Sequence, residues 1–332
     1  MGSDPSLTIV LLMSHSYAWL RRTVRMWGRQ SIHDRIEAVI VKPESLPADD
    51  LDPDDFLPFH SFRVHEIPEL DMTDTGFAAG VGLARAPIVM LAEDHAFPEP
   101  GLAAAILAAY DADPDVVAVG PALVNGNPRT SSSEASFVVS FSGVAYLQTS
   151  REARMLAGHN ASYRRDFLTL YGDDLAELYK SERMLHYDIE ARGKKMILLA
   201  HPRIQHVNAS RWSPVVAHAF HGGRIFASKR SRDWGVGRRL TYGLGAPLIP
   251  FVRIRRILRD LHESPEDYQR LIPRRLPAIA VPLVFHALGE LIGYFLGLGD
   301  SEARYAPFEL YRRDQLTPQD RRAIDHIESW ES

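Results

Sequence analysis

The sequence predicts an α/β fold in which a mostly parallel sheet is flanked by helices and followed by a helical C-terminal region. Two observations support this prediction. Between residues 7 and 120, short apolar runs alternate with segments whose apolar residues recur at helical spacing, which is typical of parallel strands joined by crossover helices. From residue 211 onward this alternation stops, and the chain becomes helical, basic and apolar by turns. We therefore expect two parts, residues 1–210 and residues 211–332.

Composition limits the classes of function. With 332 residues and 45% apolar content, the chain can bury one large core or two modest ones. Because it has no cysteine, disulfides, thiolate zinc sites and cysteine nucleophiles are excluded. The start has no basic residues before its apolar run, so we expect no secretory signal.

The net charge of −4 conceals an asymmetry along the chain. Residues 44–115 contain 16 acids and 2 bases, whereas residues 203–275 contain 15 bases and 5 acids. An acidic region suits a cation site or a solvated loop, and a basic region suits anionic lipid, phosphate or nucleic acid. The two parts are therefore expected to meet different partners.

Residues 7–92 are expected to form four strands, with a helix or a loop between successive strands. We expect a helix after a Ser16 cap, an exposed acidic loop over 42–58, and a helix of small residues capped near Thr73. In chain order, the strands are expected over 7–13, 36–41, 62–67 and 88–92, and the helices between them over 17–27 and 76–85.

Residues 102–200, the second half of the first expected part, are less regular. A helix is expected from Leu102, followed by a strand, and then by a polar, turn-rich insertion that leads into a strand-like segment. A later helix is closed by Gly193, a good stop signal. The expected ranges are strands over 116–119, 137–147 and 196–200, an insertion over 125–134, and a helix over 181–192.

The fourth expected strand delivers three polar side chains at its carboxyl end. Glu93, Asp94 and His95 follow the apolar run 88–92 and precede a Pro-Glu-Pro-Gly turn. Ligand sites of parallel sheets lie at the carboxyl ends of the strands, so we expect these side chains at the mouth of a cleft. Carboxylate and imidazole groups are also metal ligands.

Together these pieces resemble the family 2 glycosyltransferases with the GT-A fold, and the resemblance covers residues 7–210. No single motif decides it, but their order and spacing do so jointly. The motifs are Leu20-Arg-Arg-Thr23, Ala78-Ala-Gly-Val-Gly-Leu-Ala84, Glu93-Asp-His95 with Pro98-Glu-Pro-Gly101, Gly158-His-Asn-Ala-Ser-Tyr-Arg-Arg165, Glu182 with Gly193, and His206.

The resemblance implies a divalent cation, Mn²⁺ or Mg²⁺, that clamps the diphosphate of a nucleotide sugar. Its ligands would be Glu93, His95 and His206, and Glu93 and Asp94 would bind the donor. His95 stands where the family usually has an aspartate, which leaves the identity of the metal open. The alternative is structural: Glu93 and Asp94 would cap the next helix, and His206 would be a surface histidine.

The resemblance also assigns a catalytic base and further donor contacts. Glu182 would remove the proton of the acceptor hydroxyl, although it could instead be an acid favoured at a helix start. Lys42-Pro43 replaces the usual pair of aspartates, so the nucleotide is left open. The expected donor contacts are Ser14, His15 and Ser16 after the first strand, Glu44 after the second, Gly80, and Asn160. Gly80 has the alternative of a simple packing role.

The C-terminal region is read as facing a membrane. Residues 224–259 interleave arginines with aromatic and aliphatic side chains, and 276–299 is apolar except for His286 and Glu290. Because Pro277, Pro282 and Glu290 disfavour a clean span, we expect an interfacial or re-entrant helix pair. The alternatives are a spanning helix, a soluble core and an oligomer interface. Nucleic acid is disfavoured because no known binding module accompanies the arginines.

The sequence therefore predicts an inverting, metal-dependent glycosyltransferase of glycan biosynthesis, peripheral on the cytoplasmic face of a membrane. Its partners would be a nucleotide-sugar donor and a hydroxyl or phosphate acceptor, which a lipid-linked molecule would supply. The alternatives are a catalytically silent scaffold of the same fold that binds membranes, and a nucleotidyltransferase-like enzyme. Donor, acceptor, linkage and oligomeric state are left open.

Overall fold

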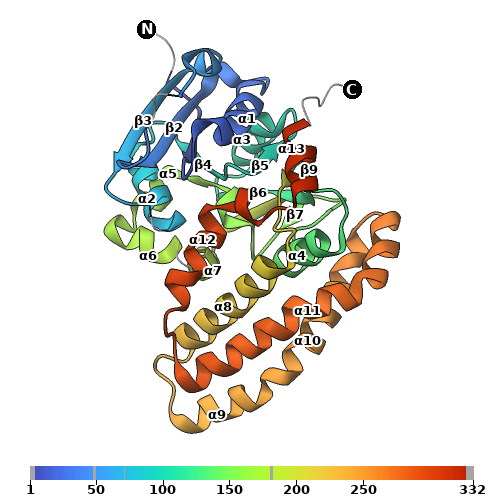
Figure 1. The fold of residues 1–332 in the computed structure, drawn as a ribbon. Helices are drawn as coiled ribbons and strands as arrows, with labels where there is room; N and C mark the ends of the chain where they lie inside the picture. The colour runs from blue at the N-terminus through green and yellow to red at the C-terminus, as the bar shows by residue number, and fades with distance from the viewer. Residues whose placement is uncertain (1–3, 48–49, 71, 180–181, 327–332) are drawn as a thin grey trace. The chain divides into compact units, whose positions relative to one another are not determined.

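The computed structural model describes residues 4–47, 50–70, 72–179 and 182–326 (Figure 1). Its internal contacts divide the chain into two compact units. Unit 1 comprises Met1–Val124 and Tyr146–His206, and unit 2 comprises Asn125–Ala145 and Val207–Ser332. The C-terminal helices thus share a unit with a segment from the middle of the chain.

Unit 1 is built on one mixed sheet. In the described residues the strand order is β3-β2-β1-β4-β8-β6-β9-β5, with β7 paired to β9. The strands are β1 (Leu7–Leu12), β2 (Ile36–Pro43), β3 (Ser61–Ile67), β4 (Ile88–Ala92), β5 (Ala96–Pro98), β6 (Val116–Asn125), β7 (Arg151–Glu152), β8 (Ser162–Arg164) and β9 (Lys195–His206). The pairs among β1 to β4 are parallel, whereas β8 runs antiparallel to both β4 and β6.

The helices of unit 1 follow the predicted alternation. The described ones are α1 (Tyr17–Gly28), α2 (Thr73–Leu83), α3 (Leu102–Ala112), α5 (Arg165–Thr169), α6 (Leu175–Tyr179) and α7 (Glu182–Ala191). Gly193 has a φ of 67°, the left-handed conformation that ends a helix and that glycine adopts without strain. The α/β fold class expected from the sequence is therefore confirmed for this part of the chain.

The three central parallel strands end at one edge of the sheet. Leu11 pairs with Ala92 of β4, and Leu12 pairs with Val41 of β2. Every residue of β1 and of β4 is buried, as expected for apolar strands covered on both faces. The loops that follow β1, β2 and β4 consequently leave the sheet side by side.

Two strands differ from the sequence prediction. The strand predicted over 116–119 is β6, which continues to Asn125 and pairs with the short antiparallel strand β8. The strand predicted over 196–200 is β9, which continues to His206. Its second half pairs with β5 and so extends the ladder beyond the apolar run that the sequence displays.

Unit 2 is helical in the residues described. Its helices are α4 (Ser131–Phe141), α8 (Trp212–Arg230), α9 (Val236–Gly245), α10 (Ile249–Asp260), α11 (Glu266–Leu296), α12 (Ser301–Leu310) and α13 (Pro318–His326). Helix α4 corrects the strand predicted over 137–147. It begins after Thr130, whose side chain accepts a hydrogen bond from the Ser133 amide at 3.3 Å and so caps the helix.

The apolar segment 276–299 also differs from its prediction, because α11 is one continuous helix and not a pair. It runs through Pro273, Pro277 and Pro282 without a break. Within unit 2 it contacts α8, α9 and α10, and α8 and α11 run side by side (Figure 1). Among the described residues, α11 is the helix long and apolar enough to cross a membrane, and 44% of its most apolar window is buried.

Helices α8 and α11 approach so closely that only glycine fits between them. A Cβ atom on Gly223 would lie 2.2 Å from the backbone oxygen of His286, and one on Gly289 would lie 2.0 Å from that of Phe220. A Cβ on Gly293 would meet the Arg224 oxygen at 2.5 Å. Glycines on one helical face permit such backbone contact. One face of α11 is therefore fixed inside unit 2.

Candidate metal centre

The turn between β4 and β5 holds Glu93, Asp94 and His95, all of them buried. The amide of Ala96 donates to the Glu93 carbonyl at 3.2 Å and closes the turn. From α1, the Thr23 hydroxyl donates to the Asp94 carbonyl at 2.9 Å. The turn is thus fixed both by its own backbone and by the first helix of the unit.

His206 reaches this turn through the pairing of β5 with β9. Ala96 lies opposite His206 in that antiparallel ladder. The Nε2 atom of His206 is 3.1 Å from Oε2 of Glu93, and Nε2 of His95 is 3.7 Å from the same oxygen. One ligand atom from each of the three residues lies within 4.8 Å of the others. The three metal ligands predicted from the sequence are therefore brought together.

Asp94 orients His95. Its Oδ1 atom is 2.8 Å from Nδ1 of the imidazole. Because a carboxylate only accepts hydrogen bonds, Nδ1 carries the proton in this contact, and Nε2 lies on the Glu93 side of the ring. A carboxylate behind a histidine in this way fixes the ring and raises its basicity as a ligand. Asp94 thus supports a ligand of the centre from behind.

Two residues of the 3-10 turn Gly158–Asn160 complete the surroundings of Glu93. Asn160, predicted as a donor contact, gives a hydrogen bond from Nδ2 to Oε2 of Glu93 at 2.6 Å. His159 places Nδ1 3.6 Å from Oε1 of Glu93. The resemblance places His159 near the sugar and the acceptor, and its contact with Glu93 was not predicted.

The charges of the centre favour an ionised carboxylate. Burial alone would raise the pKa of Glu93, but the electrostatic effect of His95 and the hydrogen bonds of His159 and His206 hold that pKa well below its ordinary value. The ionised form is the one that binds a cation. The side chain is therefore ready to act as a ligand at neutral pH.

The donor set fits a divalent cation of the first transition row. Two imidazole nitrogens and one carboxylate suit Mn²⁺, Fe²⁺, Co²⁺ or Zn²⁺, whereas Mg²⁺ prefers oxygen ligands and retained water. Of the two ions expected from the sequence, Mn²⁺ matches this chemistry better. Two features suit a bound ion: the carboxylate oxygens of Glu93 lie close to both imidazoles, and Asp94 fixes the orientation of the His95 ring.

The other predicted donor residues lie at the same edge of the sheet or in the adjacent helix. Ser14, His15 and Ser16 follow β1, and Glu44 is exposed just after β2. Gly80, in α2, faces the sheet: a Cβ there would lie 2.2 Å from Cγ1 of Val10. The close approach of Gly80 is thus explained by packing, and its contact with a donor stays a prediction.

Lys42 has a structural role at the end of β2. Its side chain is buried, and Nζ donates to the Leu46 carbonyl at 2.6 Å and pairs with Glu66 at 2.6 Å. A buried ammonium group with these partners holds the start of the acidic loop. Lys42, which replaces the expected acid, therefore bonds to groups of the protein itself.

The predicted base, Glu182, opens α7, but its side chain lies outside the part of the chain that the structure describes. One turn later, His186 is fully buried, and the Tyr163 hydroxyl is 3.0 Å from its Nε2. Burial, followed by the charge of Arg183, lowers the pKa of His186 to about 4. This histidine is therefore neutral and structural, and Glu182 stays a prediction.

The chain shares its fold with a glycosyltransferase. A mannosyltransferase from Pyrobaculum calidifontis, in complex with GDP-Man and Mn²⁺, superposes with a TM-score of 0.53 at 15% identity, covering 87% of this chain and 88% of that one. The expected GT-A type of fold is confirmed by this likeness. No family model and no curated sequence matches the chain.

Two further solved structures superpose with lower scores. GalNAc-T7 with UDP, GalNAc and Mn²⁺ has a TM-score of 0.46 at 14% identity, and the match covers 62% of this chain and 44% of that chain. Residues 1–349 of S. aureus TarS give 0.48 at 14% identity, covering 86% and 90%.

Proposed function

We propose that this chain is an inverting, metal-dependent glycosyltransferase of family 2, which moves a sugar from a nucleotide-sugar donor to a hydroxyl or phosphate acceptor. The observation that carries the proposal is the meeting of Glu93, His95 and His206 at the carboxyl edge of the parallel strands. A divalent cation held there supplies positive charge to the diphosphate leaving group.

The surrounding residues have separate tasks in this proposal. Asp94 and Asn160 hold His95 and Glu93 in place, as their hydrogen bonds of 2.8 and 2.6 Å indicate. Residues 14–16 and Glu44 bind the nucleoside, because the loops after β1 and β2 leave the sheet beside β4. Glu182 takes the proton of the acceptor hydroxyl, as the sequence motif predicts.

We further propose that the acceptor is lipid-linked and that the protein works at the cytoplasmic face of a membrane. The support is the basic and apolar composition of unit 2, where most of the exposed large apolar side chains of the described residues lie. The neighbours do not select a donor, since their names include both UDP and GDP-Man.

A thermal-shift panel tests the proposal directly. Nucleoside diphosphates and their sugars are added to the full chain with Mn²⁺, with Mg²⁺ and with a chelator. We expect one nucleotide to raise the melting temperature, and to do so only with metal, because ligands that bind the native state stabilise it by mass action. His206→Ala should abolish the metal-dependent shift, and His60→Ala, a change at an exposed histidine of unit 1, should preserve it.

Product analysis then distinguishes the rival functions. Release of a nucleoside diphosphate from the selected donor supports glycosyl transfer, whereas release of pyrophosphate selects a nucleotidyltransferase. Metal-dependent binding with no turnover of any donor selects the silent scaffold. If no nucleotide shifts the melting temperature with any metal, the proposed centre is wrong.

A further inference from the structure

Helices α9 and α10 carry large apolar side chains on their solvent face. We call this set the outer stripe. Its six members are exposed by 45 to 74% and are Val236, Leu240, Leu244, Leu248, Phe251 and Val252. They recur every three or four residues, with the 3-10 turn η5 (Ala246–Leu248) joining the two helices. At that spacing the side chains line one face.

The opposite face of the same segment carries small residues that are buried. Gly243, Ala246 and Pro250 are buried there, and Ile257 continues the row two turns after Pro250 in α10. A Cβ on Gly243 would lie 2.6 Å from the Phe295 ring of α11. A helix on the surface of a soluble protein turns its large apolar residues inward. Here the arrangement is reversed, so the outer stripe lacks the polar cover expected in water.

Arginines flank the outer stripe. Between residues 232 and 259 the chain has seven arginines and a single acid, Asp233. Arg232, Arg238, Arg255 and Arg256 are exposed. Arg238 lies over the ring of Trp234 at 4.0 Å, which places an aromatic and cationic pair beside the start of the stripe. Amphipathic rings and cations at the border of an apolar surface are typical of membrane interfaces.

We propose that the outer stripe docks on an anionic membrane surface, with its apolar side chains among the acyl chains and its arginines among the lipid headgroups. Charge complementarity decides the occupant. A second copy bound by two-fold symmetry would bring the same arginines face to face, which is unfavourable. Nucleic acid would satisfy the arginines but leave the apolar side chains in water. Only an anionic lipid surface matches both features.

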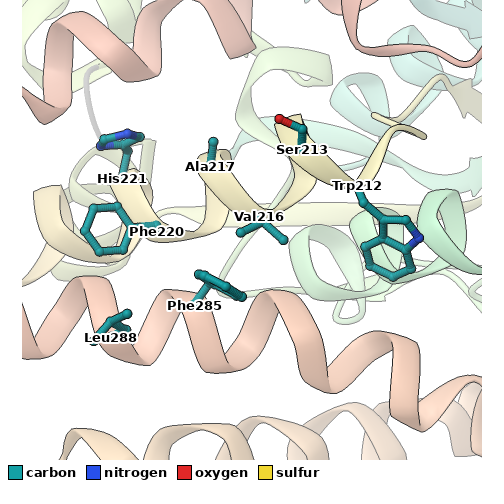
Figure 2. Close-up of a pocket in the computed structure, with 8 residues that line it drawn as sticks. All are labelled: Trp212, Ser213, Val216, Ala217, Phe220, His221, Phe285 and Leu288. Atoms are coloured by element: carbon teal, nitrogen blue, oxygen red, sulfur yellow. The ribbon is translucent and has the colours of Figure 1, made fainter.

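This assignment differs from anchoring by α11. That helix is fixed by its glycine contacts with α8, and it contacts α9 and α10 as well. A shallow apolar groove of about 620 Å³ lies between α8 and α11 (Figure 2). Val216 and Phe220 of α8 and Leu288 of α11 line it, and the lining residues within the described part of the chain include no arginine, lysine or carboxylate. The groove therefore offers no charge that would select a lipid headgroup, unlike the outer stripe.

Vesicle flotation of the full chain tests the proposal, which does not depend on sugar transfer. The probes are phosphatidylcholine vesicles with and without phosphatidylglycerol. We expect binding to the anionic vesicles that weakens with salt. The triple variant Leu244→Ser, Leu248→Ser, Phe251→Ser should lose at least about tenfold in partitioning, since each side chain adds apolar burial. Arg255→Gln with Arg256→Gln should lose about 30-fold on anionic vesicles only.

Matched controls separate docking from misfolding. Leu57 and Leu170 of unit 1 are 76% and 66% exposed, so Leu57→Ser with Leu170→Ser removes comparably exposed leucine side chains elsewhere and should leave binding unchanged. Circular dichroism confirms that each variant is folded.

Three results would overturn the proposal. The first is that the wild-type chain does not float with anionic vesicles. The second is that Val216→Ser with Leu288→Ser, in the groove, abolishes binding while the stripe variant retains it. The third is that light scattering shows an oligomer that the triple variant converts to monomer without any change in vesicle binding.

Discussion

Two glycines of α2 provide a test of how that helix packs on the sheet. A Cβ on Gly80 would lie 2.2 Å from Cγ1, 3.0 Å from Cγ2 and 3.2 Å from Cβ of Val10 in β1. A Cβ on Gly82, two residues further along the same helix, would have no atom within 4 Å. Gly80→Ala and Gly82→Ala therefore add the same methyl group, in one case into a packed contact and in the other into open space.

The expected magnitudes follow from this difference. Both changes gain helix propensity, about 1 kcal/mol in an exposed helix interior. Gly82→Ala should therefore raise the free energy of unfolding by about 0.5 to 1 kcal/mol. Gly80→Ala must also move α2 away from a buried, β-branched side chain, and overpacking of this kind costs about 1 to 3 kcal/mol. Because the gain in helix propensity is common to both variants, the difference between their free energies of unfolding isolates the cost of the clash, about 1 to 3 kcal/mol.

Urea unfolding followed by circular dichroism measures both variants against the wild type, compared at their transition midpoints. Equal stability of the two variants would refute the packing that the structure shows. If Gly80→Ala were as stable as the wild type but lost the nucleotide-dependent thermal shift, Gly80 would be a donor contact after all, as the sequence motif predicts.

Three further predictions concern the centre and its support. Asp94→Asn should weaken Mn²⁺ binding about 10- to 100-fold by calorimetry, because it removes the charge behind His95; an unchanged Kd would contradict that role. The pKa of His186 is lowered to about 4 in the folded chain, from a value near 6.5 in the unfolded chain. This histidine therefore stabilises the fold fully above pH 6.5, and its contribution of about 3 kcal/mol is lost as the pH falls toward 4. His186→Phe should consequently flatten the dependence of the free energy of unfolding on pH. Asp55→Asn removes the charge that pairs with two arginines of α1, so it should lower the free energy of unfolding in urea by about 1 to 3 kcal/mol. An equal decrease in the exposed control Asp54→Asn would contradict this role.

The strands and helices of the first 112 residues were predictable because each is marked by its own apolar pattern. Three of the four parallel strands are short apolar runs, and the third, Ser61–Ile67, alternates apolar with polar residues. Helices or an acidic loop separate them. The paired ends of β1, β2 and β4 then follow from the topology. Local sequence thus specified the edge at which the site is built.

Helix α4 was missed for a physical reason. Its buried positions include Ser132, Ser133 and Glu134, so polar residues occupy the face that normally reveals a helix by its apolar spacing. The Phe-Val-Val run beginning at Phe137 then resembles a strand. The cap at Thr130 was the remaining signal, and it lies within a stretch that reads as a loop.

The metal centre depends on a register that residue spacing alone does not reveal. Glu93 and His206 are 113 residues apart in sequence and meet because Ala96 of the three-residue strand β5 pairs with His206. Read from its apolar run, the last strand would end at residue 200, short of this contact, and only the family resemblance placed His206 near the triplet. Successive side chains of a strand point to opposite faces, so a slip of one residue would place Gln205 opposite Ala96 and turn the imidazole away from Glu93. The ladder between β5 and β9 is therefore what makes His206 a ligand, and changes that shift this ladder should remove metal binding even when all three ligands are intact.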